Sequence, residues 1–106
     1  MDLLASRFHM ASFACCEQLS LTIHMLKTNR HEEAQMQIRQ ALQLFVLPNA
    51  PFRLSFPEKA VRGLRSAEGQ SDPTQINIAD IQPAYVFALL EVKATYDSLM
   101  GGSRER

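Results

Sequence analysis

Hydrophobic residues recur at helical spacing along two long stretches that meet at a polar turn. In the second stretch the apolar stripe is Ala34, Ile38, Ala41, Leu42 and Phe45, spaced 4, 3, 1 and 3. In the first stretch it is Leu4, Phe8, Ala11, Cys15, Leu19 and Leu26. Such spacing places each stripe on one face of an amphipathic α-helix. The sequence therefore predicts two helices, over residues 2–27 and 30–47, packed as an antiparallel hairpin.

The turn between the two stretches carries a helix-start signal. Asn29 can accept a hydrogen bond from the backbone N–H of Glu32, whose side chain can reach back to the Asn29 N–H. This pattern resembles a capping box with asparagine as the cap. Pro48 disfavours helical geometry in the residue before it. We expect the second helix to begin after Asn29 and to end at Leu47, with Gln35 on its solvent face.

The proline-rich middle of the chain contains two short patterns of a different kind. Apolar and polar residues alternate over residues 52–56, which indicates a short strand, and the flanking prolines place it at a sheet edge. Residues 75–78 are a candidate second strand that could pair with the first. Ser55 and Glu58 again have capping-box spacing, so a short helix is predicted over residues 57–67.

A final helix is predicted from Asp80, a candidate N-cap, to the glycines at residues 101–102. Pro83 is tolerated there because the first N–H groups of a helix have no intrahelical partner. Five apolar residues are spaced 4, 3, 4 and 3, as in a coiled coil: Tyr85, Leu89, Val92, Tyr96 and Leu99. The chain has more apolar helical surface than one small core can enclose, so we expect these five residues to form a homodimer interface.

Size and composition describe a single globular domain spanning residues 1–106. Of the 106 residues, 46% are hydrophobic and 21% are charged. The expected fold class is mostly α: an antiparallel helical hairpin, a C-terminal helix, a short helix and two very short strands. Residues 1–9 are a candidate flexible or tag-derived extension, because His9-Met10-Ala11 would suit a tag junction or an alternative start. Residues 103–106 are expected to be a frayed tail.

Charge and hydropathy exclude several classes of partner. Eleven basic and eleven acidic residues balance to zero, whereas a nucleic-acid surface clusters Lys and Arg, so no direct nucleic-acid partner is expected. Lys59, Arg62 and Arg65 form a small basic face that we expect to be solvated, with a docking site for an acidic partner as the alternative. The longest apolar run, residues 84–90, is too short to span a bilayer. We expect a cytoplasmic protein without membrane contact.

Candidate chemistry is confined to two cysteines and three histidines. Cys15 and Cys16 are adjacent, and a disulfide between neighbours closes a strained ring, so we expect free thiols, at least one of them packed. His9 and His24 could approach Cys16 along a helical face, whereas His31 is expected to be exposed. A zinc site needs three or four convergent ligands, and a Cys–His nucleophile needs an orienting group. We predict no catalytic, cofactor or metal site, with a thiol-based redox switch or enzyme using the two cysteines as the alternative.

The size and order of these elements resemble the small helical anti-activators that restrain quorum-sensing transcription factors in pseudomonads, the QslA-like proteins. The resemblance is carried by a single domain of this length, a long helix pair meeting at Asn29, a proline-punctuated middle and the final helix from Pro83 to Met100. It implies a protein that binds the ligand-binding domain of a LuxR-type regulator, disrupts its dimerisation and so prevents DNA binding. It implies no site residues, because no motif aligns them.

Together these observations predict a small non-enzymatic regulator that acts by protein–protein contact. An apolar helix face would occupy the surface through which a target dimerises. Candidate partner-binding residues are Leu4 and Phe8, near the start of the first helix, where a long helix can project beyond a shorter partner. A structural or secretion-chaperone subunit is a further alternative.

Overall fold

Four α-helices make up most of the fold. The computed structural model describes the backbone of residues 3–101 and the side chains of residues 11–100. The helices are α1 (Leu3–Lys27), α2 (His31–Ala41), α3 (Glu58–Glu68) and α4 (Ile78–Gly101). A π-helical turn, η1 (Leu42–Val46), continues α2, and a 3-10 turn, η2 (Pro73–Gln75), precedes α4. The prediction of a mostly helical fold is confirmed, and residue 2, the predicted first residue of the first helix, lies outside the described residues.

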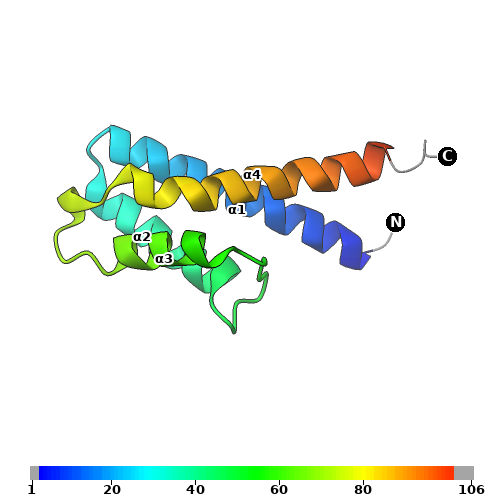
Figure 1. Cartoon of the computed structure of the whole chain (residues 1–106), viewed down its shortest axis with the longest axis horizontal. Coiled ribbons are helices and arrows are strands. Elements are labelled where there is room, and N and C mark those ends of the chain that lie inside the picture. Colours follow the sequence, from blue (N-terminus) through cyan, green and yellow to red (C-terminus); the bar gives the residue numbers. More distant parts are fainter. Residues whose placement is uncertain (1–2, 102–106) are drawn as a thin grey trace.

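The helices form two layers of unequal length. Figure 1 shows α1 and α4 side by side in opposite directions, with α2 and α3 below one half of this pair. α1 packs against α2 and α4, and α3 packs against α4, so the predicted hairpin of the first two helices is confirmed. The molecule measures 52 × 26 × 21 Å, because the beginning of α1 and the end of α4 project beyond the short helices.

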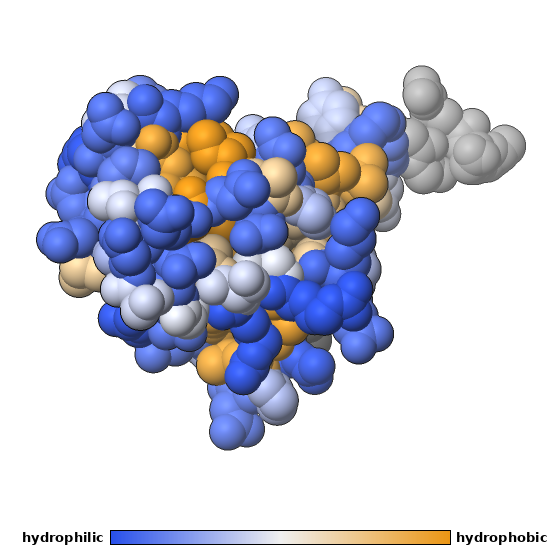
Figure 2. Space-filling model, turned by 60° about the vertical axis from the view of Figure 1, so that its left-hand side comes forward, coloured by the Kyte–Doolittle hydropathy of each residue, from blue (hydrophilic) through white to orange (hydrophobic). Residues whose placement is uncertain are grey.

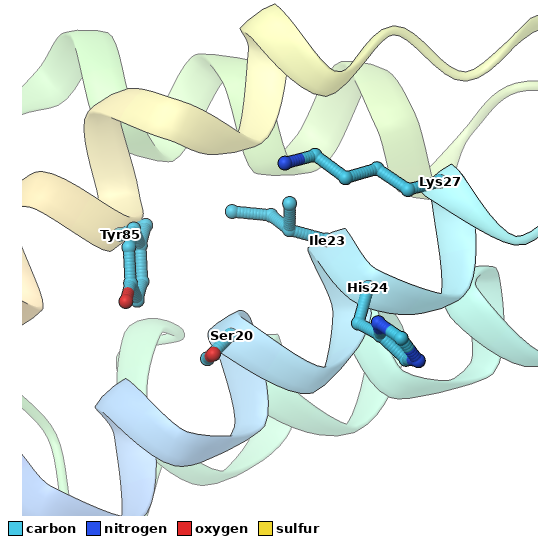
Figure 3. Close-up of a pocket in the computed structure, with 5 residues that line it drawn as sticks. All are labelled: Ser20, Ile23, His24, Lys27 and Tyr85. Carbon is cyan, nitrogen blue, oxygen red and sulfur yellow. The ribbon is translucent and has the colours of Figure 1, made fainter.

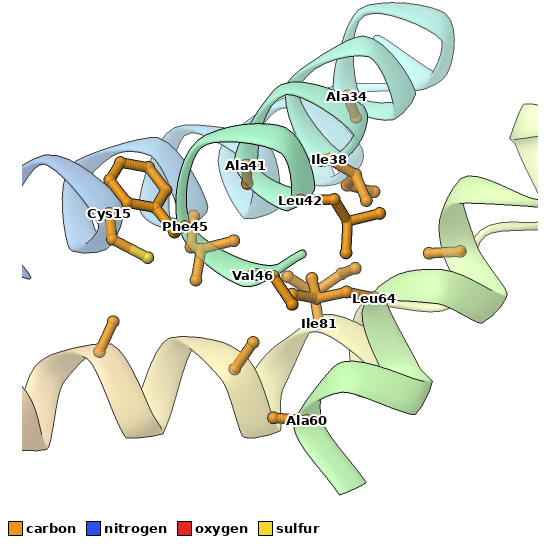
Figure 4. Packing of buried hydrophobic residues seen from close by; sticks show 14 of the residues in the cluster. Cys15, Ala34, Ile38, Ala41, Leu42, Phe45, Val46, Ala60, Leu64 and Ile81 are labelled. Atoms are coloured by element: carbon orange, nitrogen blue, oxygen red, sulfur yellow. The ribbon is translucent and has the colours of Figure 1, made fainter. Parts of the chain in front are cut away.

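The core lies where the two layers overlap. Ala34, Ile38 and Ala41 of α2 are buried, as are Leu42 and Phe45 of η1, so this predicted stripe is confirmed. They pack against apolar residues of the other three helices, among them Cys15, Leu19, Leu64 and Ile81 (Figure 4). The periodicity of the second stretch therefore located its buried face correctly.

The two predicted strands are wrong, and residues 3–101 contain no strand. Residues 52–56 fold across the end of η1, where the N–H groups of Phe52 and Leu54 donate to the carbonyls of Leu44 and Phe45 at 3.0 and 2.8 Å. When a loop donates hydrogen bonds to carbonyls at the end of a helix, its side chains can point alternately inward and outward, as those of a strand do. Residues 75–78 are the end of η2 and the start of α4.

The starts of α3 and α4 also differ from the predicted caps. α3 follows Pro57, which makes no side-chain cap bond, so the predicted capping box at Ser55 is wrong. α4 begins at Ile78, ahead of the predicted cap at Asp80, and the Asn77 side chain accepts a hydrogen bond from the Ala79 N–H at 2.9 Å. Pro83 consequently lies inside the helix. At α3 the helix starts without a side-chain cap, and at α4 a second polar residue, Asn77, lies ahead of Asp80.

Asn29 ends α1 and does not cap α2. Its φ of 64° is in the left-handed region. The Arg30 N–H donates to the Met25 carbonyl at 2.8 Å, and the Asn29 N–H donates to the Leu26 carbonyl at 3.4 Å. These two bonds define a Schellman motif, in which a left-handed residue follows the last helical turn. The predicted capping box is wrong, because Arg30 occupies the N-cap position of α2 and makes no side-chain hydrogen bond that caps the helix.

Two polar or small residues hold α3 in place. A Cβ atom at Gly63 would lie 2.2 Å from the carbonyl oxygen of Asp80, so the backbones of α3 and α4 touch there. The side-chain amide of Gln35, expected on a solvent face, donates to the Gln70 carbonyl at 2.7 Å and lies within bonding distance of two further carbonyls at the end of α3. Gln35 therefore joins α2 to the end of α3, which a single-helix pattern does not indicate.

Candidate functional site

Six large apolar side chains of α4 are exposed, although Ile81 is buried and Ile78, Tyr85 and Phe87 pack against the core. Its buried residues are Ile81, Ala84 and Ala88, two of which are alanines. The large apolar residues that it exposes are Val86, Leu89, Leu90, Tyr96, Leu99 and Met100. Monomeric proteins rarely expose so many large apolar side chains on one element, and such patches mark interaction surfaces. α4 is therefore the main candidate for a binding surface.

The five residues expected at a dimer interface, here called the α4 seam, lie on one side of the helix. The seam consists of Tyr85, Leu89, Val92, Tyr96 and Leu99. Tyr85 and Val92 are half-buried, whereas Leu89, Tyr96 and Leu99 are 42%, 58% and 59% exposed. Exposure is greatest at the far end of the seam, which lies on the part of α4 that projects beyond α2 and α3 (Figure 1). The chain itself leaves three of the five seam residues exposed.

α1 adds apolar surface next to the projecting part of α4. Phe13 is 54% exposed. In Figure 2, orange surface breaks through the polar shell in the upper part of the molecule, at the height where Figure 1 places α1 and α4. The two expected partner-binding residues, Leu4 and Phe8, belong to the first turns of α1, but their side chains lie outside the described residues.

A small pocket adjoins the first residue of the seam. It has a volume of about 260 Å³ and is lined by Ser20, Ile23, His24, Lys27 and Tyr85. Figure 3 shows the Lys27 side chain extending over Ile23 toward α4, with the Ser20 hydroxyl on the side of Tyr85. Four lining residues come from α1 and one from α4. Sequence reasoning missed this pocket, because it depends on how two helices distant in sequence pack together.

Lys27 has no counter-charge of its own. Within residues 11–100 its ammonium group forms no ion pair or hydrogen bond. The carbonyls at the end of α1 already have other donors: Thr28 Oγ1 lies 3.0 Å from the His24 carbonyl and 3.2 Å from that of Met25. On α4, Lys93 is paired with Asp97 at 2.8 Å. The pocket therefore carries one unpaired positive charge.

The cysteines lack the environment of a reactive thiol. Cys15 is fully buried, which confirms that one thiol is packed, and Cys16 is half-buried. Burial raises the pKa of the Cys15 thiol to about 12. Burial, together with the negative charge of Glu17, also raises the pKa of Cys16. Because the thiolate is the nucleophile, a thiol-based function would require a shift in the opposite direction.

The two histidines with described side chains, His24 and His31, form no ligand cluster with the cysteines. Among the described side chains, no group of three His, Cys, Asp or Glu residues could hold a metal ion. His24 is exposed beside the pocket, and His9 lies outside the described side chains. His31, expected to be exposed, is half-buried, and its Nδ1 atom has no hydrogen-bond partner within the described structure.

Comparison with known proteins adds no relative to this picture. No protein-family model, curated protein or solved structure matches the chain. Within the described residues, none of the helices is long and apolar enough to cross a membrane. The candidate site is therefore defined by the α4 seam, by Phe13 of α1 and by the adjoining pocket.

Proposed function

We propose that this protein is a non-enzymatic regulator that acts in the cytoplasm by protein–protein contact through the α4 seam. One observation carries the proposal: α4 fully buries only one large apolar residue, Ile81, beside two alanines, whereas six of its large apolar residues are exposed. A helix whose only task was to close the core would do the reverse, because burying a Leu or Tyr side chain stabilises a fold far more than burying Ala. The outward residues are explained if another protein covers them.

The amount of apolar surface supports self-association as one such contact. Each exposed seam residue offers about 100 Å² of surface, and a standard interface buries about 800 Å² per partner. The seam, its apolar neighbours on α4 and Phe13 approach that area together. Heptad-like spacing suits packing against a second helix of the same kind. The zero net charge of the chain adds no long-range repulsion between two copies. We therefore propose a homodimer joined along the seam.

The regulatory mechanism that fits such a seam is exchange of partners. A target that dimerises through an amphipathic helix would lose its own partner when the α4 seam takes its place. With the resemblance to QslA-like proteins, this suggests an anti-activator that binds a LuxR-type regulator and prevents its dimerisation and DNA binding. Leu4 and Phe8, on the projecting first turns of α1, would extend the contact beyond the seam.

Self-association is tested by placing a charge in the seam. Leu89→Asp should give a folded protein of half the mass in sedimentation, because Leu89 is exposed in the protomer but would be buried in the dimer. Leu21→Asp is the matched control, because Leu21 is equally exposed (43%) but lies on α1 outside the seam. Wild-type protein that stays monomeric at ~100 μM would end the homodimer proposal.

Anti-activation is tested on the target directly. The dimer fraction of a LuxR-type ligand-binding domain is measured while the protein is added. Wild-type protein should lower it, and Phe8→Ala should need about 30- to 1000-fold more protein, since truncating an interface aromatic commonly costs ~2–4 kcal/mol. A dimer fraction that does not change with saturating wild-type protein would contradict this role.

A further inference from the structure

The pocket of Ser20, Ile23, His24, Lys27 and Tyr85 has a chemistry that the seam lacks. From it we infer that the partner is an amphipathic helix with a carboxylate side chain in one terminal turn, and that this carboxylate binds in the pocket beside Lys27. The inference rests on the proposed function, because it assumes that the seam binds a helix. Beyond the proposed function, the inference specifies which kind of helix the protein binds.

The pocket and the seam form one continuous surface. Tyr85 is the first residue of the seam and also lines the pocket. From Tyr85 to Tyr96 the helix advances eleven residues, or about 16 Å, which is three turns of a docked helix. A three-turn helix docked from Tyr85 to Tyr96 would place its first or last turn at Tyr85, beside the pocket.

The lining of the pocket suits an acidic side chain. Ile23 and Tyr85 are half-buried and provide an apolar floor for the methylene groups of a glutamate. Lys27 crosses above Ile23, and Ser20 supplies a hydroxyl on the opposite side (Figure 3). None of the five lining residues is acidic, so a carboxylate would meet an unpaired cation and no opposing charge.

Charge complementarity favours a different protein over a second copy as the occupant. A second copy would lay its own α4 on the seam, but Asp97 of α4 is already paired with Lys93. Glu91 lies about a third of a turn away from the seam. Pairing through α4 therefore brings no unpaired carboxylate on the seam side of that helix to Lys27, whereas a partner with a terminal acid satisfies it. This difference would make exchange of partners favourable.

A simpler role for Lys27 predicts a different result. Lys27 and His24 lie in the last turn of α1, where cations interact favourably with the helix dipole. A lysine that served only this purpose would affect thermal stability and would not affect which partner binds. Peptide selectivity therefore separates the two roles.

The probes are fluorescein-labelled 15-residue amphipathic peptides whose apolar residues are spaced 4, 3 and 4. Three peptides differ at one position in a terminal turn, which is Glu, Gln or Lys. Each set is made with this position at the N-terminal and at the C-terminal end, which covers both docking directions. Fluorescence anisotropy gives the dissociation constant of each peptide for the full-length protein.

In one of the two sets, wild-type protein should bind the Glu peptide about tenfold more tightly than the Gln peptide. Lys27→Glu should reverse the order, so that the Lys peptide binds best. Lys59→Glu is the matched control, because it makes the same charge change on the exposed basic face of α3 and should leave the order unchanged. Leu89→Ala should weaken all three peptides alike, which reports on the seam independently of charge.

Several outcomes would overturn the inference. Equal affinities of wild-type protein for the Glu and Gln peptides in both sets would remove the carboxylate site but leave the seam standing, provided that Leu89→Ala still weakens binding. If Lys59→Glu changed the order of peptide affinities as much as Lys27→Glu, the preference would be a general effect of charge and would not need a site at Lys27. If no peptide binds, or if Lys27→Glu changes only the sedimentation of the protein, a second copy is the occupant of this surface and the helix-partner inference fails.

Discussion

α2 and α4 carry apolar stripes with similar helical spacing, yet the protein uses them in opposite ways. In α2 and its continuation η1, the large residues Ile38, Leu42 and Phe45 are buried. In α4, two alanines and Ile81 face the core, whereas Leu89 and Tyr96 face solvent. Periodicity shows that a helix has an apolar side. It does not show whether the chain itself covers that side.

The difference between α2 and α4 follows from how closely neighbouring helices pack against each of them. The backbones of α3 and α4 touch at Gly63 and Asp80, and Ala84 and Ala88 are buried on the core side of α4. Small residues permit such short interhelical distances. Larger residues also pack on this side: Ile81 is buried, and Tyr85 and Phe87 are half-buried. The buried alanines therefore identify the packing side of α4, whereas Leu89, Leu90 and Tyr96 remain exposed.

The largest expected effect on stability tests the difference between α2 and α4 directly. Ile38→Ala should lower the free energy of unfolding by about 3 kcal/mol, because it leaves a cavity in the core. Leu90→Ala, a comparable truncation on the outer side of α4, should cost less than about 0.5 kcal/mol. Urea denaturation at low protein concentration measures both. A similar loss for the two variants would mean that the outer side of α4 belongs to the core.

The next effect concerns the contact that keeps α4 close. Gly63→Ala should destabilise the protein by about 2 kcal/mol, because its Cβ atom would meet the Asp80 carbonyl at 2.2 Å and push the helices apart. Alanine would otherwise be the better helix former, so the sign of the change is informative. At Gly69 a Cβ atom would meet only the Arg65 carbonyl, at 3.3 Å, which makes Gly69→Ala the control. Stabilisation of the protein by Gly63→Ala would contradict the close approach.

Sequence reasoning located the helices, but it failed for structure that is set by tertiary contact and for the caps at Asn29, Ser55 and Asp80, where a local pattern fits more than one geometry. The bounds of α1 and α3 follow from periodicity and stop signals, and they were predicted to within one residue. The alternation of residues 52–56 arises from a loop that donates hydrogen bonds to η1, which a local pattern cannot distinguish from a strand. Likewise, the residues of the α4 seam were visible in the sequence, but the pocket beside Tyr85 required the pairing of α1 with α4.

Gln35 provides a smaller test of a tertiary contact on the well-covered side of the molecule. Gln35→Ala should cost about 1–2 kcal/mol, because the carbonyls at the end of α3 lose their shared donor. Gln43→Ala is the control, since Gln43 is exposed on the same helical segment and makes no such contact. Chemical denaturation compares the two. Equal denaturation midpoints for the two variants would mean that the Gln35 side chain is solvated, as its position in the helix predicted.

The smallest effect distinguishes two roles for Asn29 that predict the same loss for alanine. As an N-cap of α2 or as the left-handed residue after α1, Asn29→Ala should cost about 1 kcal/mol. The two roles differ for glycine, which lacks a capping side chain but adopts positive φ without strain. With φ at 64° and the Arg30 N–H bonded to Met25, we expect Asn29→Gly to match or slightly exceed the wild type in urea denaturation. If glycine were as destabilising as alanine, the asparagine side chain would be the stabilising element, and the end of α1 would depend on a cap that the backbone geometry does not show.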